Sequence, residues 1–325
     1  MWAALFPGQG SQHSGMGKFL YNEFKIAKET FEEASDALSI NFKKLCFDGS
    51  ESDLSLTENT QPVLVLVSTA TYRVLRSEFE FSPGSAAGHS VGEYAACVAA
   101  GAVDLRSAMS AVRARGLAMQ SAVPVGQGGM TAVMNLEPEE ITALCQWAEK
   151  ETGESPVQPA NLNAPGQIVI SGKKTILDWI AVNFKPEVVG TTARIKFIPL
   201  KVSAPFHCSM MKPAEEKMRQ VLNEIKFRNA AFPIVQNVTA QAVIEGNELR
   251  QNLIQQVCAP VRWIECVRKV VSLGHRQAVE VGCGKVLAGL ARKIDAENLS
   301  VMNMNSMVEL RAFESAVKGT SHAQR

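Results

Sequence analysis

Gly88-His89-Ser90-Val91-Gly92-Glu93 reads Gly-x-Ser-x-Gly, with small residues before it and an alanine-rich, helix-forming run after it. A strand, a tight turn that holds a serine between glycines, and a helix together form a nucleophile elbow. The glycines let neighbouring backbone approach closely, and the free N–H groups at the helix start, beginning at Val91, can stabilise an oxyanion. Ser90 is therefore the candidate nucleophile. A Gly-Ser-Gly turn without chemistry is the alternative.

The composition limits the class of protein. The chain has 325 residues, of which 46% are hydrophobic and 20% charged, with a net charge of +1 and seven cysteines. This length allows one large domain with an insert, or two domains. The balanced charge argues against a nucleic-acid partner and gives no reason to expect a membrane partner. Cysteines without a Cys-x-x-Cys pair, and an N-terminus without a signal-peptide pattern, predict reduced thiols and a cytoplasmic location.

A buried strand is expected at the N-terminus. Trp2 to Phe6 is short and apolar, and it runs into a loop in which Gln9 lies between two glycines. Sites in open α/β sheets lie at the carboxyl ends of strands, so the backbone of Gln9 could approach a ligand closely. A plain turn is the alternative.

The pattern changes after the glycine-rich stretch at residues 126–129. Strands are expected at residues 130–134, 157–162, 167–171 and 193–199, with helices at 137–150 and 174–184. This β-α-β-β-α-β order is ferredoxin-like. We therefore predict an α/β-hydrolase-like large domain with a parallel sheet, formed by residues 1–127 and 201–325. The ferredoxin-like small subdomain is expected to be inserted into it at residues 128–200.

Arg115 is unusual within the helix expected at residues 105–122. Apolar residues at helical spacing form one face of this helix, and Arg115 lies in the middle of that face, whereas Arg113 lies on the polar face and is expected to be solvated. A buried arginine needs an anion, because an unpaired buried charge is unfavourable by several kcal/mol. The anion is either a substrate carboxylate held by the guanidinium fork or an Asp or Glu elsewhere in the chain.

A serine nucleophile needs a base, and histidine is the usual one. His207 lies in an irregular, proline-containing loop and follows the serine in chain order, as in the α/β hydrolases. His89 adjoins the serine, but neighbours on an extended strand point to opposite faces. His207 is therefore the candidate base, and a histidine that only satisfies its own loop is the alternative. No acidic residue stands out as the third member of a triad.

Several motifs in register carry a resemblance that covers residue 4 to about residue 295. They are Phe6-Pro7-Gly8-Gln9-Gly10-Ser11-Gln12, Gly88-His89-Ser90-Val91-Gly92-Glu93, Arg113-Ala114-Arg115-Gly116-Leu117-Ala118-Met119-Gln120, Asn161-Leu162-Asn163-Ala164-Pro165-Gly166-Gln167, Ala204-Pro205-Phe206-His207 and Glu280-Val281-Gly282-Cys283-Gly284-Lys285-Val286-Leu287. Together they resemble the malonyl-CoA:acyl-carrier-protein transacylase family.

The resemblance implies a role for each matching residue. Ser90 would carry the acyl group as an ester, and His207 would act first as base and then as acid. Backbone N–H groups of Gln9 and Val91 would form the oxyanion hole, and Arg115 would hold the malonyl carboxylate.

In the family a backbone carbonyl orients the histidine, and the matching position is Gln256, which accounts for the missing acid. Asn161 would line the site from the small subdomain. Phe206 departs from many bacterial members, which have a small residue there. It resembles malonyl-selective domains of polyketide synthases and favours malonyl over methylmalonyl.

The activity implied is transfer of malonyl from malonyl-CoA to the phosphopantetheine thiol of holo-acyl-carrier protein, supplying fatty-acid synthesis. The expected enzyme is a monomer that uses no metal and no cofactor. The alternatives are a trans-acting acyltransferase that serves a polyketide synthase and a serine acyl hydrolase. A buried Arg115 disfavours a hydrolase of plain alkyl chains.

Overall fold

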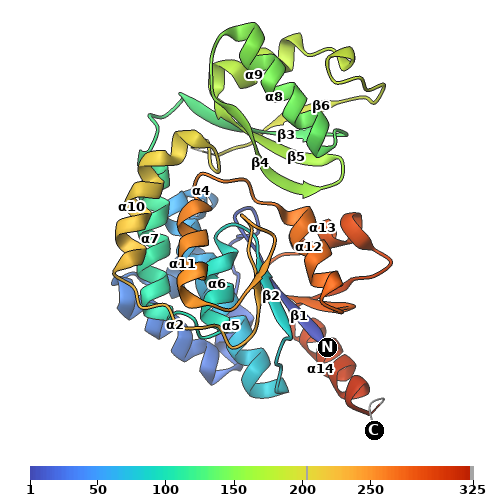
Figure 1. Cartoon of the computed structure of the whole chain (residues 1–325). Coiled ribbons are helices and arrows are strands. Elements are labelled where there is room, and N and C mark those ends of the chain that lie inside the picture. The colour runs from blue at the N-terminus through green and yellow to red at the C-terminus, as the bar shows by residue number, and fades with distance from the viewer. Residues whose placement is uncertain (203, 323–325) are drawn as a thin grey trace.

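The chain forms two β-sheets, and Figure 1 shows the smaller sheet above the larger one. A computed structural model describes residues 1–202 and 204–322. Within these residues the larger sheet has the strand order β10-β9-β1-β2-β7-β8 and the smaller sheet the order β4-β5-β3-β6. The strands are β1 (Trp2–Phe6), β2 (Ser85–Gly88), β3 (Gly128–Met134), β4 (Val157–Ala164), β5 (Gln167–Lys173), β6 (Lys196–Pro199), β7 (Ile234–Val235), β8 (Ala242–Val243), β9 (Gln277–Glu280) and β10 (Ser300–Asn303).

Helices connect most of these strands. The first group, before the small sheet, is α1 (Lys18–Glu23), α2 (Lys25–Leu38), α3 (Phe42–Asp48), α4 (Glu51–Ser55), α5 (Thr57–Phe79), α6 (Gly92–Ala99) and α7 (Leu105–Ser121). The remainder are α8 (Pro138–Thr152), α9 (Lys174–Asn183), α10 (Lys212–Asn223), α11 (Gly246–Gln255), α12 (Trp263–Ser272), α13 (Val286–Asp295) and α14 (Met307–His322). Short 3₁₀ turns occur at Pro186–Val188 and Ser209–Met211.

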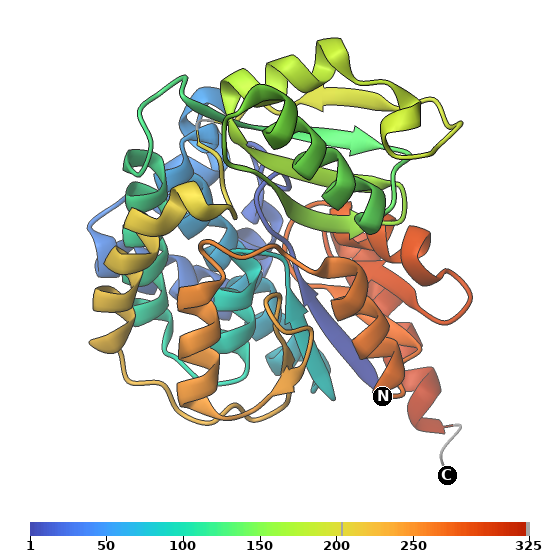
Figure 2. The ribbon, with the colours of Figure 1, turned by 45° about the horizontal axis from the view of Figure 1, so that its top comes forward.

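The N-terminal strand β1 lies inside the larger sheet and is buried on both faces. It pairs in parallel with β2 on one side and with β9 on the other. Ala4 and Phe6 join an apolar core with helices α2, α5, α6 and α7, while Ala3 and Leu5 join a second core with α12 and α13. Figures 1 and 2 show these two groups of helices on opposite sides of the blue and cyan strands. A strand covered on both faces explains why residues 2–6 are uninterruptedly apolar.

The larger sheet is parallel except at one edge. β10, β9, β1, β2 and β7 all run in the same direction, and only β8 pairs antiparallel, with β7. The predicted large α/β fold with a parallel sheet is thus confirmed. None of the helices among the described residues is long and apolar enough to cross a membrane.

The smaller sheet is antiparallel and formed by consecutive elements of the chain. Its element order β3-α8-β4-β5-α9-β6 and strand order confirm the predicted ferredoxin-like arrangement. Ile168 and Ile170 pack against the core that contains α8 and α9, while Val169 points the other way and joins the main core. The sheet therefore has one face under its own helices and one face toward the larger sheet (Figure 1). The domain limits at residues 127 and 200 stay a prediction.

The segment between α11 and α12 joins the two sheets. The backbone N–H of Val261 donates to the carbonyl of Ala160 at 2.8 Å, and the N–H of Leu162 donates to the carbonyl of Val261 at 2.9 Å. These bonds add a short parallel bridge to the outer side of β4. They place Asn161, between the two bonded residues, at the seam where the sheets meet.

Candidate active site

Ser90 lies in a tight turn between β2 and α6. Its φ is 52°, in the left-handed region that a residue with a Cβ rarely adopts. A Cβ on Gly88 would lie 2.1 Å from the carbonyl carbon of Gly92, and a Cβ on Gly92 would lie 2.2 Å from the carbonyl oxygen of Phe6. Glycine is therefore required on both sides of the serine, as predicted, because β1, β2 and α6 converge there.

A buried amide holds the strained turn. The backbone N–H of Ser90 donates to Oδ1 of Asn237 at 2.8 Å, and Nδ2 of Asn237 donates to the carbonyl of Gly88 at 2.7 Å. Asn237 lies two residues after the end of β7. No sequence motif marks this residue, because an asparagine in a loop carries no signature of its own.

The structure places His207 beside Ser90. Its Nε2 lies 2.7 Å from the serine Oγ, and its Nδ1 lies 2.8 Å from the backbone carbonyl oxygen of Gln256. A carbonyl can only accept, so Nδ1 carries the proton and Nε2 is free to accept from the serine hydroxyl. Burial and the charge of Arg115 lower the pKa of His207 to about 3, against the opposing effect of the Gln256 carbonyl. The imidazole is thus neutral near pH 7 and able to take up a proton.

Arg115 is buried, as its position on the apolar face of α7 predicts, with 1% of the side chain exposed. Nη2 donates to Oγ of Ser90 at 3.3 Å and to Oε1 of Gln256 at 3.0 Å, while Nε has no partner. None of the ion pairs within residues 1–202 and 204–322 includes it. The direct ion pair considered from the sequence is therefore not found.

The prediction that Arg113 is solvated is wrong. Its Nη1 donates to the carbonyl of Glu58 at 2.7 Å and to Oδ1 of Asn59 at 2.9 Å, and Nη2 pairs with the Glu58 carboxylate at 3.2 Å. The first turn of α5 lies over this side chain, which is 25% exposed. Helical periodicity shows which face a residue occupies, but not which distant segment covers that face.

Glu93 is the second buried charged group of the site. One of its carboxylate oxygens accepts from the backbone N–H of Asn237, and the other accepts from Nε2 of Gln256. Burial raises the pKa of Glu93 to about 8, whereas these two donors and the charge of Arg115 lower it. Glu93 belongs to the elbow motif, but the sequence indicates no role for it.

Ser90, His207 and Arg115 border a cavity of about 90 Å³. Its lining residues are Gln9, Gln61, His89, Ser90, Arg115, Met119, Met130, Asn161, Leu200, Val202, Phe206 and His207. Six of the residues singled out in the sequence thus meet here, from both sheets and from the segment that connects them. Val91 follows the serine directly at the start of α6, and Gln256 lies behind the histidine.

His89 also lines the cavity, although neighbours on an extended strand were expected to point apart. The left-handed turn at Ser90 ends the extended conformation, so that expectation does not apply. Nε2 of His89 lies 2.8 Å from Oδ1 of Asn163 on β4, and the ring packs edge-on against Trp263 at 5.4 Å. The contact ties the elbow to the smaller sheet.

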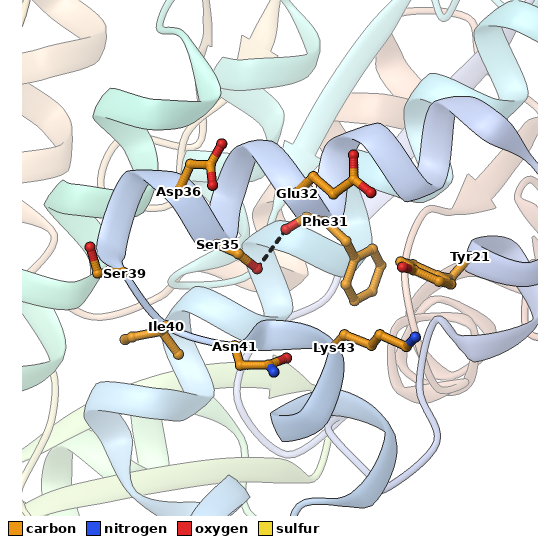
Figure 3. Close-up of a pocket in the computed structure, with 9 residues that line it drawn as sticks. All are labelled: Tyr21, Phe31, Glu32, Ser35, Asp36, Ser39, Ile40, Asn41 and Lys43. Carbon is orange, nitrogen blue, oxygen red and sulfur yellow. Dashed lines mark hydrogen bonds between the residues drawn. The ribbon is translucent and has the colours of Figure 1, made fainter.

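A larger hollow of about 380 Å³ lies elsewhere, around the connection between α2 and α3. Figure 3 shows its lining residues, which are Tyr21, Phe31, Glu32, Ser35, Asp36, Ser39, Ile40, Asn41 and Lys43. Its Ser35 hydroxyl donates to the carbonyl of Phe31 at 2.8 Å, and the lining contains no histidine to activate a nucleophile. Size alone therefore does not identify the site.

Metal-ligating side chains are not clustered in the described part of the chain. No group of three or more His, Cys, Asp or Glu residues there is arranged to hold a metal ion. All seven cysteines are free, as the spacing predicted.

The chain is similar to acyltransferases over nearly its whole length. Residues 4–306 match the family model described as acyl transferase domain. The Malonyl CoA-acyl carrier protein transacylase of Bacillus subtilis (strain 168) is 42% identical over 294 residues, which are 90% of each chain. The crystal structure of acyl-carrier-protein S-malonyltransferase from Burkholderia pseudomallei 1710b is 38% identical, with a TM-score of 0.89 over 97% of this chain and 99% of that one. A complex of a type II PKS acyl-carrier protein with its malonyl-transacylase is 37% identical, with the same TM-score and coverage.

The depressed pKa of His207 predicts how stability depends on pH. Between about pH 6.5 and about pH 3 the unfolded chain binds a proton that the folded chain does not, so this histidine's contribution to stability is lost as the pH falls. When the pH is lowered from about 7 to about 5, the free energy of unfolding should fall in both proteins. The fall should be about 2 kcal/mol smaller in His207→Gln than in the wild type. Urea unfolding at the two pH values measures this. His13→Gln, a change in an exposed loop, serves as control and should follow the wild type. Equal falls in His207→Gln and the wild type would contradict the prediction.

The close approach at Gly92 predicts that even one methyl group is not tolerated there. Gly92→Ala should lower the free energy of unfolding by at least about 2 kcal/mol and abolish the reactivity of Ser90, since the Phe6 carbonyl must move. Gly289→Ala in α13 is the matched control, because a Cβ there meets nothing within 4 Å. That control should be neutral or stabilising by up to about 1 kcal/mol. Denaturant unfolding of both variants tests the difference, and equal effects would refute it.

Proposed function

The chain belongs to the acyl transferase domain family, and we propose that it transfers the malonyl group of malonyl-CoA to the phosphopantetheine thiol of a holo-acyl-carrier protein. The observation that carries this proposal is a buried guanidinium next to a serine–histidine pair. Arg115 Nη2 lies 3.3 Å from Oγ of Ser90, and the Nε of the same fork has no partner. An acyl group with a terminal carboxylate supplies the anion that such a fork binds.

The first half of the reaction forms an acyl-serine. Nε2 of His207 takes the hydroxyl proton as Oγ of Ser90 attacks the thioester carbonyl, since the two atoms are 2.7 Å apart. The tetrahedral intermediate then collapses, the C–S bond breaks, and the coenzyme A thiolate takes the proton from His207. Malonyl remains bound to the serine as an ester.

The second half reverses these steps with a different thiol. His207 removes the proton of the phosphopantetheine thiol, whose sulfur attacks the ester carbonyl. The C–O bond breaks, and Ser90 recovers its proton from the imidazolium. The carbonyl of Gln256 keeps the imidazole oriented through both halves by accepting from Nδ1 at 2.8 Å. This route requires neither a metal nor a nucleotide cofactor.

The backbone is the proposed source of oxyanion stabilisation. Val91 is the N-cap residue of α6 and follows the nucleophile directly, at the end of the helix where N–H groups lack a partner one turn earlier. Gln9 lines the cavity from the loop that follows β1. We assign the oxyanion hole to the N–H groups of these two residues, which would donate to the negative oxygen in both tetrahedral intermediates.

The rest of the cavity is proposed to select the acyl group. Phe206 is 7% exposed, precedes the base and lines the cavity, so its ring would crowd an α-methyl group on the acyl chain. Asn161 lines the cavity from β4 and offers an amide to the thioester or the carboxylate. This arrangement favours malonyl over methylmalonyl.

The partner and setting are further parts of the proposal. We propose an acyl-carrier protein of fatty-acid synthesis as the acceptor, with the enzyme acting as a monomer in the cytoplasm. A carrier protein of a polyketide synthase is the second candidate, because one similar structure is the complex of a type II PKS acyl-carrier protein with its malonyl-transacylase. Hydrolysis is the less favoured outcome, because the buried Arg115 disfavours plain alkyl chains.

Intact mass spectrometry tests the transfer directly. The protein is incubated in turn with malonyl-, methylmalonyl- and acetyl-CoA, weighed, and then mixed with a holo-carrier protein. Malonyl should label Ser90 and then move to the carrier. Absence of a label, or a label lost only to water, would refute the transferase proposal.

Arg115→Ala should change which acyl group is loaded. Losing a charge-assisted pair with the malonyl carboxylate should lower kcat/KM for malonyl loading by about ten- to hundredfold and raise the ratio of acetyl to malonyl loading. Arg113→Ala is the matched control, because Arg113 lies on the same helix and bonds to Glu58 and Asn59 outside the cavity. It should keep the wild-type ratio. An Arg115→Ala enzyme that loads malonyl at the wild-type rate would overturn the carboxylate role.

A further inference from the structure

The side chain of Gln256 lies between two buried groups of opposite charge. Its Nε2 donates to a carboxylate oxygen of Glu93, and its Oε1 accepts from Nη2 of Arg115 at 3.0 Å. Glu93 and Gln256 are both 0% exposed, and Arg115 is 1% exposed. The carboxylate and the guanidinium are thus connected through one neutral amide, without direct contact.

We propose that Glu93 is a positioning residue that serves as the remote counter-charge of Arg115 and acts through the amide of Gln256. It holds the guanidinium and the base in place while leaving the fork open to the substrate. The inference rests on the proposed function, because it concerns the carboxylate of the malonyl group.

A remote counter-charge solves a problem that a direct ion pair would create. A carboxylate bound to the guanidinium would occupy the donors that the substrate carboxylate needs, and substrate would have to displace it. An amide satisfies one N–H of Arg115 at Nη2 and leaves Nε without a partner. Because the three side chains are buried, the negative charge still stabilises the cation at this distance, and it polarises the amide between them.

The same carboxylate connects the other parts of the site. Gln256 also orients His207 through its backbone carbonyl at 2.8 Å and donates from Nε2 to the carbonyl of Ser90 at 3.0 Å. The other oxygen of Glu93 accepts from the backbone N–H of Asn237, whose side chain holds the N–H of Ser90. Glu93 therefore acts on the nucleophile, the base and the guanidinium through single intermediates, and touches none of the reacting atoms.

The ionised form of Glu93 fits these contacts, because both of its oxygens accept N–H groups. A protonated carboxyl, like a glutamine, would turn a donor toward another donor. Burial raises the pKa of Glu93 to about 8, so the counter-charge develops as the pH rises through that value. The titratable groups around it are Tyr94 and Cys97 on α6, Arg115 on α7, Cys266 on α12 and, through Gln256, His207. The pKa values of the tyrosine and the cysteines are raised, and that of His207 is lowered to about 3, which leaves Glu93 to titrate near pH 8.

A double-mutant cycle tests the proposal with malonyl-CoA as the probe. Glu93→Gln, Arg115→Ala and the combined variant are compared with the wild type by the rate of malonyl loading, at about pH 9 and about pH 7. At the higher pH we expect Glu93→Gln to lower kcat/KM for loading by roughly ten- to hundredfold. In the Arg115→Ala background, the loss of kcat/KM caused by Glu93→Gln should be at least about threefold smaller. The loss that persists there measures the effect of Glu93 through His207. At the lower pH the wild type and Glu93→Gln should converge.

Glu280→Gln is the matched control. Glu280 is also 0% exposed and accepts N–H groups, from Leu287 at 3.0 Å and Ala288 at 2.9 Å, but it lies at the end of β9, outside the network. This change should lower the midpoint of thermal unfolding without altering the pH profile of loading or coupling to Arg115→Ala. If Glu93→Gln does not fold, Glu93→Asp replaces it in the same double-mutant cycle. Aspartate keeps the negative charge on a side chain that is one methylene group shorter.

The outcomes separate this inference from the proposed function. A wild type that does not load malonyl contradicts the function itself. If the wild type loads malonyl, the proposed function stands and the counter-charge is tested separately. The counter-charge alone is overturned if Glu93→Gln lowers kcat/KM for loading by the same factor in both Arg115 backgrounds, or by the same factor at both pH values.

Discussion

Burial of the Arg115 guanidinium is the constraint on which the site depends. An unpaired charge in an apolar interior is unfavourable by several kcal/mol, and α7 places this one among apolar side chains. The polar groups that compensate it come from segments far apart in the chain: the turn after β2, the start of α6 and the end of α11. The contacts that stabilise the charge are therefore also the contacts that hold Ser90 and His207.

The features that could be predicted from the sequence are local or carry their own chemical signature. The apolar run at residues 2–6 and the alternation of short strands and helices after residue 126 depend on neighbouring residues alone, and both predictions are confirmed. The glycines around Ser90 report a close approach of backbone that no other residue permits. Arg115 could be recognised as a site residue because an ionised side chain is unexpected on the apolar face of a helix.

The features that could not be predicted depend on which distant segments meet. Asn237 and Glu93 are ordinary polar residues in the sequence, and only the convergence of β7, α6 and α11 makes them part of the site. Arg113 was expected in solvent because its helix shows a polar face there, and the first turn of α5 covers it instead. The short helices α1, α3 and α4 and the strand β8 have too few residues for a periodic pattern.

In the proposed function, the seam between the two sheets separates the reactive groups from the groups that select the acyl chain. Ser90 stands on the larger sheet, held by backbone convergence at Gly88 and Gly92, where no variation in side chain is possible. Asn161 reaches the same cavity from the smaller sheet, and Phe206 reaches it from the segment by which the chain returns. The cavity wall can therefore change in shape without straining the elbow. Arg115 is the exception, because its charge is coupled through Gln256 to the orientation of His207.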